Sequence, residues 1–193
     1  MRRILLRCIE FFKHYGREWD KLSPTKEEAI EFAHKNINEE PLKYIPNTLK
    51  ATAFLTLARG GETINERLRN DYDDSDVPNV AKTISQIQCK KNLVLYRGIT
   101  NETYQQMKDA AKEYENIDLY DKGFLQTSLV KGQEIKREIR LRIFVPYGTN
   151  VIYLGNVNDE EERYYEVDVQ YGAKLKIVSM DKTYINCVLI ITK

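Results

Sequence analysis

Hydrophobic residues recur at helical spacing in the first half of the chain and at alternate positions in the second half. In the first 90 residues, apolar side chains three or four positions apart predict helices, at residues 4–12, 24–33, 49–57 and 80–87. The helix at 24–33 has a favourable start, because Pro24 follows Ser23 and acidic residues stand in the first turn. Residues 70–78 contain four Asp and predict a solvated loop.

Alternation with a period of two begins near residue 92 and predicts β-strands. We expect them at 93–97, 124–130, 139–145, 150–154, 166–170, 175–180 and 184–192, with one helix at 103–114. This order indicates an α+β fold, with a helical lobe over residues 1–90 and an antiparallel β-rich core over residues 91–193. The length of 193 residues fits a single domain.

Composition narrows the classes of function. Hydrophobic residues make up 42% of the chain and charged residues 31%, as in an ordinary globular protein. With 30 basic and 29 acidic residues the formal net charge is +1, which argues against a general nucleic-acid binder. No apolar run approaches the ~20 residues that span a bilayer. Arg7 and Glu10 interrupt the apolar stretch near the N-terminus, so no signal peptide is visible.

The cysteines and histidines predict neither a disulfide framework nor a metal site. Cys8, Cys89 and Cys187 are far apart in the sequence and have no zinc-binding spacing. His14 and His34 have no Cys/His cluster around them. We therefore expect no bound metal and no histidine-based catalytic triad.

Three segments carry candidate chemistry, and they follow one another in a fixed order. Arg97 ends one predicted strand, Thr127 and Ser128 lie in the next, and Glu166 begins a later strand. This arrangement resembles the active site of mono-ADP-ribosyltransferases of the Arg–Ser–Glu class. The resemblance implies a β-core of two packed sheets and NAD as co-substrate, from which ADP-ribose is transferred to a target.

The required chemistry suits these residue types. Breaking the nicotinamide–ribose bond of NAD develops positive charge on the ribose, as in glycoside cleavage. A carboxylate stabilises that charge, and a guanidinium holds phosphate oxygens in pairs. The resemblance thus implies a catalytic role for Glu166 and Ser128, with Ser128 orienting the carboxylate.

A fourth segment, Ile64–Arg69, reads Ile-Asn-Glu-Arg-Leu-Arg. It resembles a helix of the clostridial Rho-modifying exoenzymes and of the enzymatic components of actin-modifying binary toxins. The resemblance implies NAD contacts from Asn65 and Arg69, which are four residues apart and so share a helix face. It implies further NAD contacts from Arg97, Gly98, Thr127 and Ser128. Lys131, Lys136 and Arg137 are equal candidates for one more phosphate contact.

Two positions depart from the family pattern. Gln126 stands where the family has Ser, and Tyr164 stands where the family has the Glu or Gln that governs transfer. Tyr164 and Tyr165 end the segment 155–165, which matches the loop that recognises the target, and Tyr164 can stack on a partner. These departures leave the acceptor open: it is a protein, a nucleic acid, a small molecule or water. They also leave open that the chain is a non-catalytic NAD-binding relative.

The resemblance also implies partners and location. Its members are bacterial toxins and effectors that modify host proteins such as a small GTPase or actin. We expect a secreted or injected monomer that acts in the host cytosol, delivered by a separate component or another route.

Overall fold

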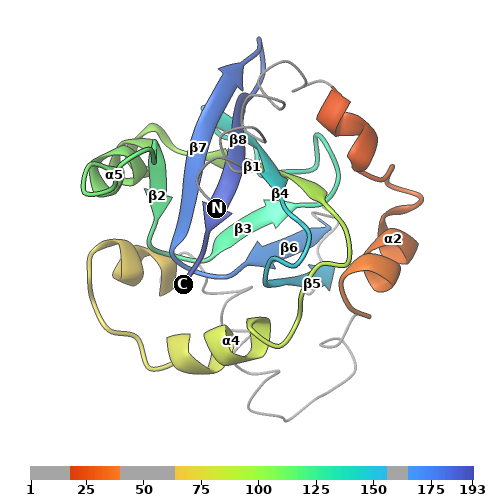
Figure 1. The fold of residues 1–193 in the computed structure, drawn as a ribbon, viewed down its shortest axis with the longest axis horizontal. Coiled ribbons are helices and arrows are strands. Elements are labelled where there is room, and N and C mark those ends of the chain that lie inside the picture. Colours follow the sequence, from red (N-terminus) through yellow and green to blue (C-terminus); the bar gives the residue numbers. More distant parts are fainter. Residues whose placement is uncertain (1–17, 40–63, 156–164) are drawn as a thin grey trace.

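The computed structural model describes residues 18–39, 64–155 and 165–193 (Figure 1). Its helical elements are the 3-10 helix η1 (Glu18–Leu22), the α-helices α2 (Ala29–Asn36), α4 (Val77–Ile84) and α5 (Asn101–Ala111), and a helical segment at 64–69. The strands are β1 (Leu93–Ile99), β2 (Leu119–Asp121), β3 (Leu125–Ser128), β4 (Ile139–Val145), β5 (Val151–Gly155), β6 (Glu166–Val169), β7 (Ala173–Met180) and β8 (Ile185–Ile191).

The eight strands form one hydrogen-bonded ladder in the order β2-β7-β8-β4-β1-β3-β6-β5. All neighbouring strands are antiparallel except β4 and β8. β1 and β3 are joined at a single residue pair, Tyr96 with Ser128, whereas β1 pairs with β4 along its whole length. The ladder therefore has two halves, β2-β7-β8-β4-β1 and β3-β6-β5, connected at one narrow point.

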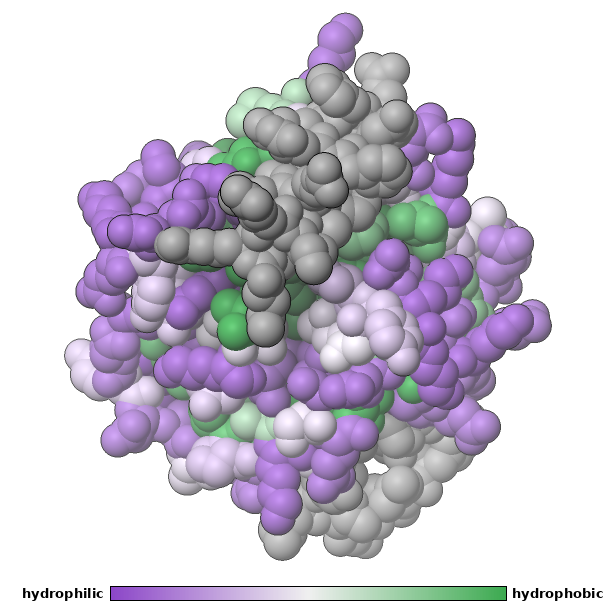
Figure 2. Space-filling view, viewed as in Figure 1, coloured by the Kyte–Doolittle hydropathy of each residue, from purple (hydrophilic) through white to green (hydrophobic). Residues whose placement is uncertain are grey.

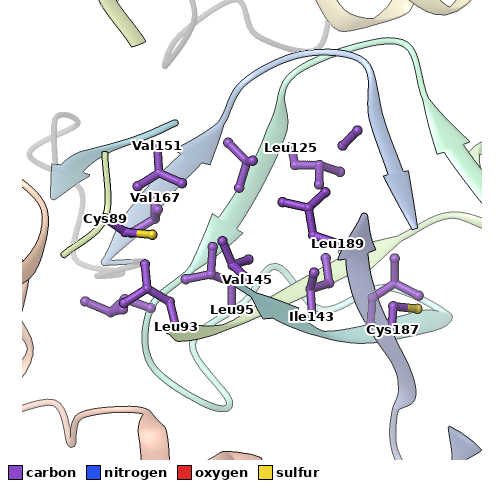
Figure 3. Close-up of a cluster of buried hydrophobic side chains, with 14 of the residues drawn as sticks. Cys89, Leu93, Leu95, Leu125, Ile143, Val145, Val151, Val167, Cys187 and Leu189 are labelled. Carbon is purple, nitrogen blue, oxygen red and sulfur yellow. The ribbon is translucent and has the colours of Figure 1, made fainter. Parts of the chain in front are cut away.

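The two halves face each other across the main hydrophobic core (Figure 3). Leu95, Ile143 and Val145 come from the first half, and Leu125 and Val167 from the second. The alternation of apolar and polar positions in these strands produces this packing, since successive side chains point to opposite faces. A strand slipped by one residue would expose its apolar set, so the core fixes the register of the strands near the site.

The helical segment at 64–69 and helix α4 cover the β3-β6-β5 half of the ladder. Val77, Val80 and Ile84 of α4 form a second hydrophobic cluster with Ile64 and Phe124. Helix α2 lies on another side of the molecule and buries Ala29 and Ala33 completely in the main core. The face in Figure 2 is mainly hydrophilic, with only small, separate hydrophobic areas among the coloured residues. No helix among the described residues is long and apolar enough to cross a membrane.

The predicted α+β class is confirmed, with several differences in detail. The helix predicted at 24–33 begins only at Ala29 and ends at Asn36, because residues 26–28 form a turn. Strand β2 had no sequence signal, because three residues are too few for a periodic pattern. Helix α4 begins at Val77 instead of residue 80, with Pro78 in its first turn, where a missing N–H costs nothing. The core is not purely antiparallel, because β4 and β8 run parallel. The helices predicted at 4–12 and 49–57 lie outside the described residues.

Candidate active site

The segment Asp121–Ser128, which runs from β2 through β3, contacts most of the side chains proposed for NAD binding. At its start, both carboxylate oxygens of Asp121 accept hydrogen bonds from Arg69, each at 3.0 Å from Nε or Nη2. Nη2 of Arg97 lies 3.1 Å from the same carboxylate. Two arginines predicted to contact NAD are thus held side by side by one acid.

The charges of this group are set by burial. Asp121 is fully buried, which raises its pKa, but Arg69 and Arg97 more than offset this and the pKa lies below its ordinary value. Burial lowers the pKa of Arg97 to about 10, although Asp121 favours its charged form. Arg97 therefore stays protonated at neutral pH.

Arg97 has one nitrogen to spare. Its Nη1 is buried and has no hydrogen-bond partner among the described residues. Buried polar groups are rarely left unpaired, so such an atom needs an explanation. A phosphate oxygen is the acceptor that a guanidinium binds most readily, which fits the predicted contact with NAD.

Gly123 gives Asn65 its place beside this segment. A Cβ atom on residue 123 would lie 2.7 Å from Oδ1 of Asn65, so only glycine leaves room. The backbone N–H of Phe124 donates to that oxygen at 2.8 Å. Asn65 is buried, and its Nδ2 donates to Oε1 of Gln126 at 3.0 Å. The side chain predicted to contact NAD thus also ties the 64–69 helical segment to β3.

Gln126 connects this network to Glu166. Its Nε2 donates to Oε1 of Glu166 at 3.3 Å, from the strand beside β6. Ser128 lies directly opposite Glu166 in the β3–β6 register, as its predicted orienting role requires. Its hydroxyl, however, donates to the carbonyl of Val130 at 2.9 Å. In this structure the amide of Gln126, and not the hydroxyl of Ser128, holds the carboxylate.

Two other predicted NAD-binding residues have structural contacts. Thr127 is buried and donates through Oγ1 to the carbonyl of Val167 at 2.5 Å, which ties β3 to β6. Gly98 allows the loop after β3 to pass close to β1, because a Cβ atom there would lie 1.8 Å from the carbonyl oxygen of Ile135. Their contacts with NAD stay predictions.

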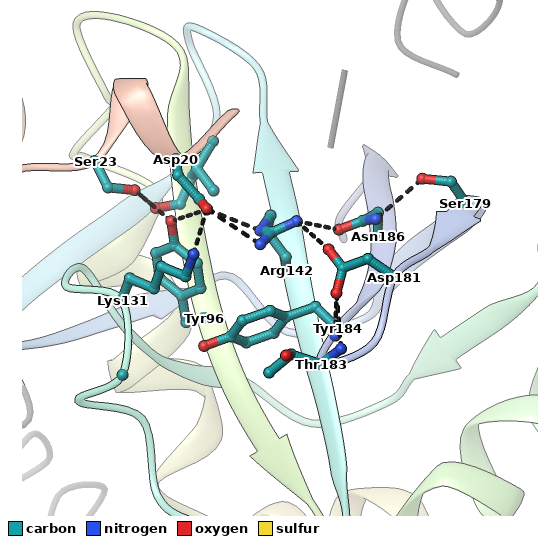
Figure 4. A network of polar contacts seen from close by, with 12 residues as sticks. Asp20, Ser23, Tyr96, Lys131, Arg142, Ser179, Asp181, Thr183, Tyr184 and Asn186 are labelled. Atoms are coloured by element: carbon teal, nitrogen blue, oxygen red, sulfur yellow. Dashed lines mark hydrogen bonds and ion pairs between the residues drawn. The ribbon is translucent and has the colours of Figure 1, made fainter. Parts of the chain in front are cut away.

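The loop at residues 131–137 is tied to a polar network on the other side of β1 (Figure 4). Lys131 forms an ion pair with Asp20 of η1, and Asp20 also pairs with the buried Arg142 of β4. Lys131 therefore has a partner within the protein. Lys136 and Arg137 are exposed, and the structure does not choose between them as phosphate ligands.

Of the two residues predicted to recognise the target, the structure describes only Tyr165. Tyr164 lies outside the described residues. Tyr165 is buried within the main core, and its φ of 48° is uncommon for a residue with a side chain. Its carbonyl accepts a hydrogen bond from the N–H of Leu129 at 3.0 Å. The predicted role of Tyr165 in target recognition stays a prediction.

A second acid lies beside Glu166. Asp168 is two residues further along β6 and fully buried, directly opposite Gln126. Burial raises the pKa of Glu166, and it raises that of Asp168 well above its ordinary value, with the Glu166 charge adding to the effect. The sequence did contain a signal for this residue, since positions two apart in a strand share a face.

Comparison with known proteins identifies the family. A model of the ADP-ribosyltransferase exoenzyme family matches residues 53–191. The chain belongs to this family. It is an ADP-ribosyltransferase with NAD as its co-substrate, as the resemblance implied. No curated protein sequence matches the chain.

Solved structures share the fold at low sequence identity. The C3 exoenzyme of Clostridium limosum superposes with a TM-score of 0.66 at 19% identity, over 88% of this chain and 97% of that one. An ADP-ribosyltransferase of Clostridium botulinum gives 0.63 at 18% identity, over 89% and 98%. The ADP-ribosylating toxin of a binary enterotoxin of C. perfringens gives 0.62 at 15%, over 85% of this chain and 48% of that one.

Proposed function

We propose that this ADP-ribosyltransferase is a bacterial toxin or effector that modifies a host protein, with Glu166 as the catalytic carboxylate. One observation supports the assignment of the site above all others. The segment Asp121–Ser128 contacts Arg69 and Arg97 at one end and, through Asn65 and Gln126, Glu166 at the other. Cations suited to phosphate and a carboxylate, all in contact with one segment, suit a dinucleotide whose phosphates lie near the bond to be broken.

The reaction divides the work between these groups. The bond between nicotinamide nitrogen and ribose C1′ breaks, and its electron pair leaves with nicotinamide, which becomes neutral. C1′ gains oxocarbenium character, and the carboxylate of Glu166 stabilises this charge. A nucleophilic atom of the acceptor then bonds to C1′ and loses its proton to solvent. Arg97 and Arg69 hold the diphosphate through both steps.

A labelling experiment tests this assignment. The purified protein is incubated with labelled NAD and eukaryotic cell lysate, and modified proteins are counted and identified by mass spectrometry. We expect Glu166→Gln to lower labelling about 100- to 1,000-fold, the usual effect of removing one electrostatic stabiliser. Glu102→Gln, a change at an exposed position of α5, is the matched control and should label normally. Labelling that survives in Glu166→Gln would remove Glu166 from the proposal.

The same preparation decides the acceptor. Nicotinamide release is measured with lysate protein, with DNA, with RNA and with no acceptor. A rise with protein alone supports a protein target, and the modified residue then follows from the mass spectra. Release that no acceptor changes would instead identify NAD hydrolysis as the activity.

A further inference from the structure

We propose that Asp168 is a positioning residue, which holds the Glu166 carboxylate through a hydrogen bond from its own protonated carboxyl group. The inference rests on the proposed role of Glu166. It starts from the placement of two acids on one face of β6, in a part of the fold that offers Asp168 no other donor among the described residues.

The surroundings of Asp168 are unusual for a charged group. Its side chain is fully buried, and neither carboxylate oxygen has a hydrogen-bond donor among the described residues. Its cross-strand partners are Gln126 on β3 and Ile152 on β5. Gln126 gives its amide to Glu166 and not to Asp168. An ionised carboxylate left in this way would carry a large desolvation cost.

A proton on Asp168 removes this difficulty. Two carboxylates cannot hydrogen-bond to each other, but a carboxylic acid can donate to a neighbouring carboxylate. Such a bond lowers the pKa of Glu166, against the effect of burial, and raises that of Asp168, in addition to the effect of burial. The negative charge then resides on Glu166, which is the less buried of the two and receives the Gln126 amide.

The remaining charged groups do not reverse this distribution. Arg97 of β1 is the cation that favours the ionised form of Asp168, but its effect is smaller than those of burial and of Glu166. Arg97 is paired with Asp121 of β2, which Arg69 also binds. Nη1 of Arg97 has no acceptor among the described residues, so it does not bond to either oxygen of Asp168. A phosphate bound to Arg97 would weaken its attraction for a charge on Asp168 further.

The consequence for catalysis is a fixed carboxylate. Gln126 and Asp168 both donate to Glu166, so its negative charge is held in one orientation before the ribose gains positive charge. Preorganised groups of this kind stabilise a transition state without rearrangement during the reaction. Asp168 itself does not touch NAD in this account, since it acts through Glu166.

Two substitutions show whether Asp168 acts as a hydrogen-bond donor or as a charged group. Asp168→Asn keeps a hydrogen-bond donor of similar shape, and Asp168→Val removes it. We measure nicotinamide release, NAD affinity by calorimetry and thermal unfolding for both. We expect Asp168→Asn to keep kcat within about threefold and Asp168→Val to lose about tenfold, the value of one hydrogen bond to a charged group. NAD affinity should change less than about threefold in either, and Asp109→Asn, on the exposed face of α5, is the control.

The pH profile gives a readout that a purely structural role would not move. We expect activity to rise with pH as Glu166 loses its proton. Loss of the donor raises the pKa of Glu166, so this rise should move to higher pH by about one unit in Asp168→Val and stay in place in Asp168→Asn. Thermal unfolding and NAD calorimetry establish whether each variant is folded before its pH profile is compared with that of wild type.

Each result decides the proposal. Equal loss in the two variants would mean that Asp168 must be charged, and full activity in both would mean that it has no positioning role; either overturns the inference. If wild-type protein releases nicotinamide and Glu166→Gln does not, such a failure concerns Asp168 alone. If Glu166→Gln is as active as wild type, the proposed function has failed, and the inference fails with it.

Discussion

Gly123 and Asn65 are packed so closely that a single methyl group on residue 123 would meet Oδ1, Cγ and Cβ of Asn65 at 2.7, 3.0 and 3.1 Å. Asn65 cannot move aside without breaking its bonds to Phe124 and Gln126. The glycine is therefore part of the site, although it carries no side chain.

Gly123→Ala tests this relationship. We expect it to lower the free energy of unfolding by about 1–3 kcal/mol, the usual cost of overpacking, and to weaken NAD binding by displacing Asn65. Urea denaturation and calorimetry measure the two effects. In an Asn65→Ala background most of the obstructing side chain is gone, so adding Gly123→Ala should cost less than in wild type. Equal costs in both backgrounds would show that the methyl group acts elsewhere.

Asp121→Asn should destabilise the fold, because it leaves two largely buried guanidinium groups without a full counter-charge. We expect a loss of about 3–5 kcal/mol, as when one partner of a buried ion pair is removed. Asp71→Asn is the matched control: its ion pair with Lys122 is exposed, and loss of such a pair costs about 0–1 kcal/mol. Similar losses in the two variants would contradict this account.

The contribution of Asp121 to the free energy of unfolding depends on pH, and its direction follows from the pKa. Its pKa is lower in the folded protein than the unfolded value of about 3.9. The stabilisation is therefore complete above about pH 4 and is lost as the pH falls through the folded pKa. Denaturation curves of wild type and Asp121→Asn should be far apart near neutral pH and approach each other as the solution is acidified below about pH 4.

Substitutions of Arg97 and of Glu166 should affect different quantities, NAD affinity in the first case and kcat in the second. Arg97→Lys loses paired contacts to phosphate, so we expect NAD affinity to fall about 10- to 100-fold with a smaller effect on kcat. Glu166→Gln should leave affinity nearly unchanged and lower kcat, because its contribution grows in the transition state. Calorimetry with NAD and rates of nicotinamide release measure both. The same pattern in the two variants would contradict this division of roles.

Asp20→Asn should loosen η1 from the sheet. Asp20 accepts a hydrogen bond from the Tyr96 hydroxyl at 2.8 Å and pairs with Arg142 and Lys131 (Figure 4). Its neighbour Trp19 is buried against Phe144 and is the only tryptophan of the chain. We therefore expect a red-shifted emission and stronger acrylamide quenching. Glu18→Gln, whose partner is Lys21 on the surface, should leave the spectrum unchanged.

The local pattern of the sequence predicted most of the described elements because each strand of the core alternates clearly. It did not predict which strands become neighbours, since pairing depends on contacts between distant residues. The parallel pairing of β4 with β8 and the single joint between Tyr96 and Ser128 are of this kind. The missed strand β2 has the same origin: Leu119–Asp121 has no pattern of its own and is ordered by pairing with β7.

The sequence could predict those site residues that belong to a recognisable motif. Arg69, Arg97 and Asn65, for which the resemblance implies NAD contacts, all bond to one segment, and the NAD contacts themselves stay predictions. The supporting residues were not predicted, because their importance comes from burial and from their neighbours. Asp121 holds two arginines only after folding, and Gln126 looked like a departure from the pattern although it is the residue that bonds to Glu166.

Tyr165 lies between the predicted target-recognition segment and β6. Its ring is buried in the core, and its backbone is in the left-handed region. The residues after it belong to β6, whose register against β3 is fixed by four residue pairs. The resemblance assigns target choice to the residues before it. Under the proposed roles, changes in those upstream residues leave the position of Glu166 intact. In evolutionary terms, descendants of this enzyme can then acquire a new target without having to evolve NAD cleavage again.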